Sequence, residues 1–144
     1  MKKINQIKIK HKGFTLLEIM VVVVIIAVMA AAVVPSIIGK LDEASISRTK
    51  TDIKSIETAL KLYRASNFSY PSTDQGLEAL VSKPSGNPEP RSWSQQLPKA
   101  PIDPWKNPYK YISPGTRGGD FDLYSLGPDG IASDDDIGNW DLDN

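Results

Sequence analysis

The dominant pattern in this chain is an uninterrupted apolar run near its N-terminus. From Phe14 to Val34 there are 21 residues with a single charge, Glu18, and with neither glycine nor proline. A helix that rises about 1.5 Å per residue would span about 31 Å over this run, which is the thickness of a bilayer's hydrocarbon core. Five lysines and no acidic residue precede the run, at Lys2, Lys3, Lys8, Lys10 and Lys12. This asymmetry predicts a cytoplasmic N-terminus and an exported chain held by one membrane anchor.

A second pattern, amphipathic in character, follows across residues 35–67. Its apolar positions step by three and four residues, as the buried face of a helix does. These positions are Ile53, Ile56, Leu60 and Tyr63. Pro35 need not end the helix, because a proline can kink a helix whose neighbours satisfy the lost backbone bond. If both segments are continuous, they form one helix of about 53 residues, roughly 80 Å long.

The remaining chain, residues 68–144, predicts a small globular domain. Ser72 to Gln75 has the spacing of a capping box and predicts a short helix from Thr73 to about Val81. Seven prolines between Pro84 and Pro108 exclude regular structure there, and nearby aromatic residues favour an ordered loop. Two alternating segments then predict strands, at residues 109–112 and 121–125.

Composition excludes several classes of function. The chain has no cysteine, and its single histidine, His11, lies within the basic leader. Without the leader, residues 1–13, the chain keeps 12 basic against 17 acidic side chains, a formal net charge of −5. It therefore lacks the residues of Ser-His-Asp or Cys-His catalysis and the usual zinc ligands, and it has no basic patch for nucleic acid. We expect a protein that is not an enzyme.

Glu18 is unusual because a carboxylate within an apolar helix costs about 2–3 kcal/mol or more in lipid. One interpretation is an acid that reaches the headgroups and interacts favourably with the helix dipole. The other is a buried acid that pairs with a cation of another copy, such as the α-amine that cleavage after Gly13 would create on Phe14. Position alone leaves both open.

The segment K-H-K-G-F-T-L-L-E, residues 10–18, resembles the class III signal of type IV pilins and pseudopilins. The resemblance implies that a prepilin peptidase cuts between Gly13 and Phe14 and that Phe14 is N-methylated. It also implies that Glu18 acts in subunit assembly. A rival interpretation is an ordinary secretory signal cut after Ala32, which would release a soluble protein beginning at Val33. The length of the apolar run and the presence of Glu18 favour the pilin-type signal.

Four further segments are similar to the major pseudopilin family of the type II secretion system. They are YPSTDQGLEAL (70–80), IDPWKNPYKY (102–111), SLGPDG (125–130) and DIGNW (136–140). This resemblance implies an α+β, type IV pilin-like fold, in which a long N-terminal helix packs on a small antiparallel sheet domain with a calcium-type loop. Residues 14–34 would be the transmembrane and assembly helix, and residues 35–67 its amphipathic continuation.

The same resemblance implies a structural subunit of the periplasmic pseudopilus that drives export of folded proteins. The chain would be a single-pass protein of the bacterial inner membrane, with its C-terminal domain in the periplasm. Its partners would be copies of itself in a helical filament, minor pseudopilins, the inner-membrane assembly platform and the prepilin peptidase. The alternatives are a type IV pilus subunit for adhesion, motility or DNA uptake, and an exported monomeric binding protein.

An acidic stretch closes the chain. From Gly118 onward there are eight aspartates and no lysine or arginine. Repulsion among carboxylates disfavours a compact arrangement, and a calcium ion with six to eight oxygen ligands would reverse this effect. Spacing alone leaves a solvated loop and a metal loop about equally open, since the EF-hand pattern is absent. The family resemblance favours calcium and implies a ligand set of the Leu126 carbonyl, Asp129, Ser133, Asp135 and Asp136. The ion would then be a structural staple for a domain without disulfides.

Overall fold

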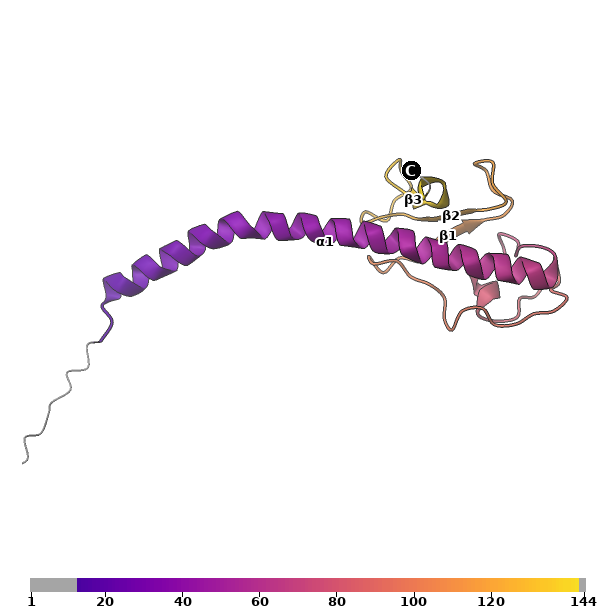
Figure 1. Ribbon diagram of the computed structural model, residues 1–144, viewed down its shortest axis with the longest axis horizontal. Helices are drawn as coiled ribbons and strands as arrows, with labels where there is room; N and C mark the ends of the chain where they lie inside the picture. The colour runs from indigo at the N-terminus through magenta and orange to yellow at the C-terminus, as the bar shows by residue number, and fades with distance from the viewer. Residues whose placement is uncertain (1–12, 143–144) are drawn as a thin grey trace, which may run out of the picture. The chain divides into compact units, whose positions relative to one another are not determined.

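The computed structural model describes residues 13–142, which divide into two compact units between Lys40 and Leu41. Residues 1–12, which contain the five lysines of the basic leader, lie outside the described residues. The elements in chain order are α1 (Leu16–Asn67), the 3-10 helix η1 (Leu77–Leu80), the strands β1 (Lys110–Ile112), β2 (Asp122–Ser125) and β3 (Ile137–Gly138), and the 3-10 helix η2 (Asn139–Asp141). Figure 1 shows them along the chain.

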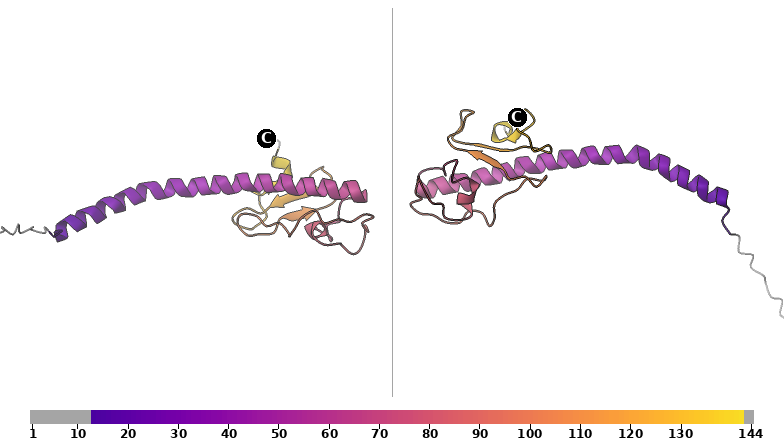
Figure 2. Two further views of the ribbon diagram at one scale, coloured as in Figure 1. Left: turned by 60° about the horizontal axis from the view of Figure 1, so that its bottom comes forward. Right: turned by 180° about the vertical axis from the view of Figure 1, so that it is seen from behind.

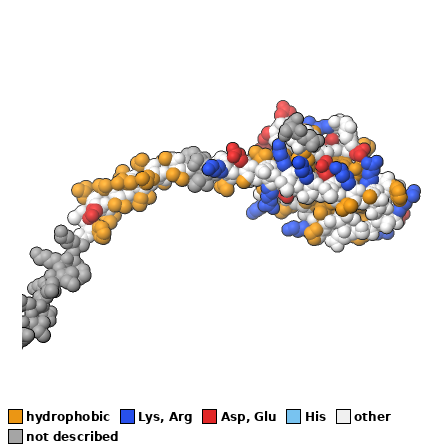
Figure 3. All heavy atoms as spheres, in the orientation of Figure 1, with side chains coloured by type: hydrophobic (Ala, Val, Ile, Leu, Met, Phe, Trp, Pro, Cys, Tyr) orange, Lys and Arg blue, Asp and Glu red, His pale blue; other side chains and the backbone are white. Residues whose placement is uncertain are grey.

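Helix α1 runs from Leu16 to Asn67 and continues through Pro35. In the first unit, the apolar side chains of residues 16–33 are exposed, as the hydrophobic surface in Figure 3 shows. In the second unit, the predicted stripe is confirmed, because Ile53, Leu60 and Tyr63 are at most 1% exposed. The first half of α1 therefore needs lipid or another protein to cover its apolar side chains. The second half covers the core of its own domain.

The sheet of the second unit has three antiparallel strands in the order β1-β2-β3. Strands β1 (Lys110–Ile112) and β2 (Asp122–Ser125) pair with Tyr111 opposite Leu123, so both predicted strands are confirmed, each beginning one residue later than expected. Strand β3 (Ile137–Gly138) pairs with β2 and was not predicted, because two residues carry no alternation. In Figures 1 and 2, β1 and β2 lie along the second half of α1.

One core joins α1 to the sheet and to the segment that follows the helix. The rings of Tyr111 in β1 and Phe121, which precedes β2, have centroids 5.9 Å apart. Leu80 is fully buried in the same core cluster. The hydroxyl of Tyr111 donates a hydrogen bond of 2.8 Å to the carbonyl of Pro71. This bond attaches β1 to the chain just beyond the end of α1.

The predicted short helix at Thr73–Val81 is only partly correct. The capping-box bonds are present, since the Ser72 amide donates to the Gln75 side chain (3.1 Å) and the Gln75 amide donates to the Ser72 hydroxyl (3.3 Å). The segment forms a turn and then η1 (Leu77–Leu80) in place of an α-helix. Gly76 explains the difference, because its φ of 57° lies in the left-handed region and breaks the right-handed path.

The proline-rich segment is an ordered loop, as its aromatic residues indicated. The Trp93 indole N–H donates to the Ala79 carbonyl at 2.8 Å, and the Leu97 amide donates to the Leu80 carbonyl at 3.0 Å. Both bonds attach the loop to η1, and Trp93 and Leu97 pack on the core. The proline-rich loop is therefore a packed part of the second unit.

Candidate assembly helix and acidic loop

The start of α1 carries a cap that sequence reasoning missed. The hydroxyl oxygen of Thr15 accepts a hydrogen bond from the Glu18 amide at 3.2 Å, so Thr15 is the N-cap of the helix. The signal was available, because a threonine followed three residues later by glutamate is the capping-box pattern. The cap fixes where the helix begins and therefore places Glu18 in its first turn.

Helix α1 begins with a candidate membrane span, which includes Glu18. Leu16–Val33 has a mean hydropathy of 3.0, and none of this window is buried. Within residues 13–142 the ion pairs are Arg48–Asp52 and Arg64–Asp120. Glu18 therefore has no cationic partner in the described part of its own chain.

The acidic loop, residues 126–136, leaves β2 and returns to β3. Gly127 and Gly130 have φ values of 67° and 68°, a region that favours glycine, and they turn the chain at the loop's first half. The Asp129 carboxylate accepts a hydrogen bond from the Ile131 amide at 3.0 Å. The second half is closed by Ser133, whose amide donates to Asp136 at 3.3 Å and whose hydroxyl contacts the Asp135 carboxylate.

Three of the implied calcium ligands lie close together in the acidic loop. Ser133, Asp135 and Asp136 come together, and all the proposed donors are oxygens, which suits calcium. Asp129 lies in its own local turn. Across residues 13–142 no group of three or more acidic or histidine side chains is close enough to hold a metal. The chemistry of the donors fits calcium, whereas the carboxylates do not form a ready-made cluster.

The base of the acidic loop is held by a buried hydrogen-bond network, which we call the neck. It consists of Asp103, Asn107, Ser125 and Gly127. Asp103 is 3% exposed and accepts bonds from the Ser125 hydroxyl at 2.6 Å and the Asn107 amide at 2.8 Å. The Ser125 hydroxyl in turn accepts a bond from the Gly127 amide at 3.1 Å, and the Asn107 side chain donates to the Gly127 carbonyl at 3.4 Å. The neck therefore connects the 103–107 turn to the first residues of the acidic loop.

A second buried carboxylate holds the turn between β1 and β2. Asp122 accepts hydrogen bonds from the amide and the hydroxyl of Thr116, at 2.7 and 2.6 Å. Burial raises the pKa of Asp122, but these bonds and the Arg117 amide outweigh burial and lower the pKa below its usual value. Arg117 also lies over the Trp140 ring, 3.9 Å from its centroid, and so connects this turn to η2 (Asn139–Asp141).

An exposed apolar helix that continues into the covering helix of a small antiparallel sheet domain defines a pilin-like subunit. Comparison with known proteins agrees with this class. The family model described as "Type II secretion system (T2SS), protein G" matches residues 36–140, and a model of the prokaryotic N-terminal methylation motif matches residues 8–34. The chain belongs to the type II secretion system protein G family.

Individual relatives show the same. The chain is 56% identical over 138 residues to type II secretion system core protein G of Pseudomonas aeruginosa, a match that covers 92% of this chain and 96% of the relative. It is 48% identical to the Vibrio cholerae protein, covering 92% and 94%. The crystal structure of the major pseudopilin of enterohaemorrhagic Escherichia coli superposes with a TM-score of 0.68 at 44% identity, covering 74% of this chain and 91% of that one. These relatives do not favour the type IV pilus alternative.

Proposed function

We propose that this chain is the repeating structural subunit of a periplasmic pseudopilus and that it performs no catalysis. The observation that carries the proposal is the exposed apolar half of α1, which no part of residues 13–142 covers. Before assembly the lipid of the inner membrane covers it, and in the filament the equivalent helices of other copies do so. The family to which the chain belongs supports this assignment.

The first step toward the filament is cleavage of the leader between Gly13 and Phe14 by a prepilin peptidase, followed by N-methylation of Phe14. The match to the methylation motif over residues 8–34 supports this step. Phe14 is 80% exposed and precedes the capped first turn of α1, so the bond between Gly13 and Phe14 lies in non-helical chain. Cleavage at that bond would leave the span Leu16–Val33 intact.

Glu18 would then pair with the N-terminal amine of a neighbouring copy during assembly. A carboxylate without a cationic partner in an apolar helix is costly in lipid, and pairing in the filament would remove that cost. We expect Glu18→Ala to insert and to be cleaved normally but to assemble poorly. Glu43→Ala is a matched control, because Glu43 is an exposed acid on the same helix beyond the apolar span. Normal filaments from Glu18→Ala would refute the pairing.

Calcium would bind the acidic loop through the Leu126 carbonyl, Asp129, Ser133, Asp135 and Asp136. The ion would supply positive charge and oxygen coordination where the carboxylates otherwise repel one another. Asp129→Ala should remove most of the difference in melting temperature between calcium and chelator. Asp134→Ala, which changes an exposed aspartate outside the ligand set, should preserve that difference. A wild-type protein that melts at one temperature with and without chelator would exclude the site.

The remaining partners follow from the same assignment. The filament would contain minor pseudopilins, and the inner-membrane assembly platform would extract subunits from the membrane. Negative-stain microscopy of cells that overproduce the chain together with the secretion system tests this proposal. Filaments containing this chain are expected, and their absence would refute the subunit role.

A further inference from the structure

Phe68 has a conformation and an exposure that the fold of a single copy does not require. It is the residue after α1, with φ 65°, and its amide donates to the Arg64 carbonyl at 2.7 Å. Glycine or asparagine usually takes this left-handed position at a helix end, because other side chains are strained there. The Phe68 side chain is nevertheless 77% exposed, and the Arg91 guanidinium lies 5.5 Å from its ring centroid.

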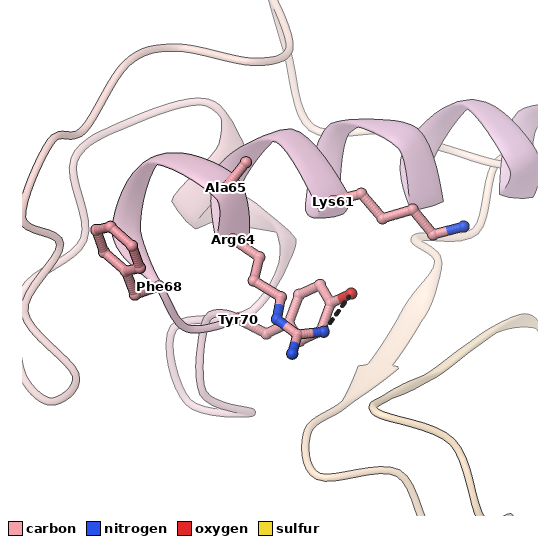
Figure 4. A pocket seen from close by; sticks show the side chains of 5 residues that line it. All are labelled: Lys61, Arg64, Ala65, Phe68 and Tyr70. Atoms are coloured by element: carbon pink, nitrogen blue, oxygen red, sulfur yellow. Dashed lines mark hydrogen bonds between the residues drawn. The ribbon is translucent and has the colours of Figure 1, made fainter.

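Phe68 borders a surface depression that we call the Phe68 hollow. The hollow has a volume of about 520 Å³. It is lined by Lys61, Arg64, Ala65, Phe68 and Tyr70 (Figure 4). Arg64 lies over the Tyr70 ring, 4.9 Å from its centroid, and is paired with Asp120 of the same copy at 2.9 Å. Lys61 is exposed on the preceding turn. The hollow therefore combines aromatic surface with a basic rim, where Lys61 supplies the charge that has no ion pair within residues 13–142.

The tip of the acidic loop has the opposite character. Ile131 is 67% exposed, and the exposed residue Ala132 follows it. Carboxylates flank this apolar tip on both sides, at Asp129 and at residues 134–136. These four carboxylates would keep a net charge of about −2 even with one calcium ion bound. An apolar tip with an acidic rim is complementary to an aromatic hollow with a basic rim.

The hollow and the start of the acidic loop lie at opposite ends of the second unit. The Tyr109 hydroxyl contacts Asp52, whereas the Tyr111 hydroxyl contacts Pro71 beyond the end of α1, so β1 runs toward that end. Strand β2 is antiparallel and returns the chain to the Asp52 level, where the acidic loop begins. Asp52 and Phe68 are about 24 Å apart along the helix direction. The acidic loop therefore leaves β2 about 24 Å from the hollow of its own copy, which favours a second copy as the partner of the hollow.

We propose that the Phe68 hollow of one copy receives the Ile131 tip of a second copy. This inference rests on the proposed filament and specifies one of its contacts. Because the two surfaces differ, the contact is head-to-tail, and a head-to-tail contact that does not close into a ring propagates as a helix. Phe68 would lose much of its exposed surface, and Lys61 would face Asp134 of the second copy.

The absence of cysteine allows a direct test by disulfide crosslinking of the full-length chain in cells with a type II secretion system. The double variant Phe68→Cys/Ile131→Cys should give a ladder of dimers, trimers and higher species under mild oxidation. Either single variant should give almost none. Ile102→Cys in place of Ile131→Cys is a matched control, since Ile102 is also exposed, at 51%. Dimers from Phe68→Cys alone would show a symmetric contact and would overturn the inference.

Charge exchange provides a second, independent readout. Lys61→Glu and Asp134→Lys should each reduce filament yield several-fold, and their combination should restore most of it. Lys54→Glu, the same change on another exposed lysine of α1, should not be rescued by Asp134→Lys. Filaments of normal yield that lack the Phe68–Ile131 crosslink would overturn this contact and leave the subunit role intact. Failure of the wild-type chain to form filaments would overturn the subunit role and this contact together.

Discussion

The hydrogen bonds of the neck predict how much stability the domain loses when Asp103 is replaced. Asp103→Ala removes the acceptor of two hydrogen bonds, one of them from Ser125, which is fully buried. Each buried donor left without a partner costs about 1–3 kcal/mol, and relief of a buried charge offsets part of this cost. We therefore expect a loss of about 2–4 kcal/mol. A domain of this size has a total stability of about 5–15 kcal/mol, so the loss is a large fraction.

Urea unfolding of the detergent-solubilised chain, followed by tryptophan fluorescence, measures this loss. All three tryptophans, Trp93, Trp105 and Trp140, lie in the second unit, so the signal reports that unit alone. With an m-value of about 1.5 kcal/mol/M, the midpoint should fall by about 2 M. Asp120→Ala is the matched control, because it breaks only the exposed pair with Arg64 and should cost under about 1 kcal/mol. Equal midpoints for the two variants would refute the role of the neck.

Three further predictions follow from the second unit. Gly138→Ala should lower stability by about 1–3 kcal/mol in the same assay, because the added Cβ would overlap the Trp140 ring; an unchanged midpoint would contradict the packing. Asp122 has a pKa below its usual value in the folded state, so its stabilisation is present above about pH 4 and is lost as pH falls. Asp122→Asn should therefore reduce the slope of stability against pH in acid, and an identical slope would count against the Thr116 bonds. Burial raises the pKa of Tyr111 to about 12, so its stabilisation is present below about pH 10 and is lost as pH rises toward 12. Tyr111→Phe should cost about 1 kcal/mol at neutral pH and flatten the alkaline decline; an undiminished decline would contradict this assignment.

The features that could be predicted from the sequence are those in which apolar residues recur at a regular spacing. The apolar run and the Ile53–Tyr63 stripe appear in α1 as expected, because burial on one face of a helix fixes the spacing of apolar residues. The two longer strands likewise follow from alternation. Strand β3 could not be predicted, since it owes its pairing to β2 and its close packing to Gly138 and Trp140.

Some residues of the candidate sites could be identified from the sequence, and others could not. Glu18 could be identified from sequence because a charge in an apolar run is rare, and Thr15 could have been identified from the capping-box spacing. The neck could not, because Asp103 and Ser125 are far apart in sequence and meet only in the folded chain. Phe68 was also missed, since nothing in its neighbours signals a left-handed backbone with an exposed ring.

The central claim is that a processed, membrane-anchored chain supplies the filament. Intact mass of the membrane-extracted protein, combined with N-terminal sequencing, tests this claim most directly. We expect a chain that begins at Phe14 and carries one additional methyl group. A soluble chain that begins at Val33 would contradict the account, because it would have lost both the apolar half of α1 and Glu18.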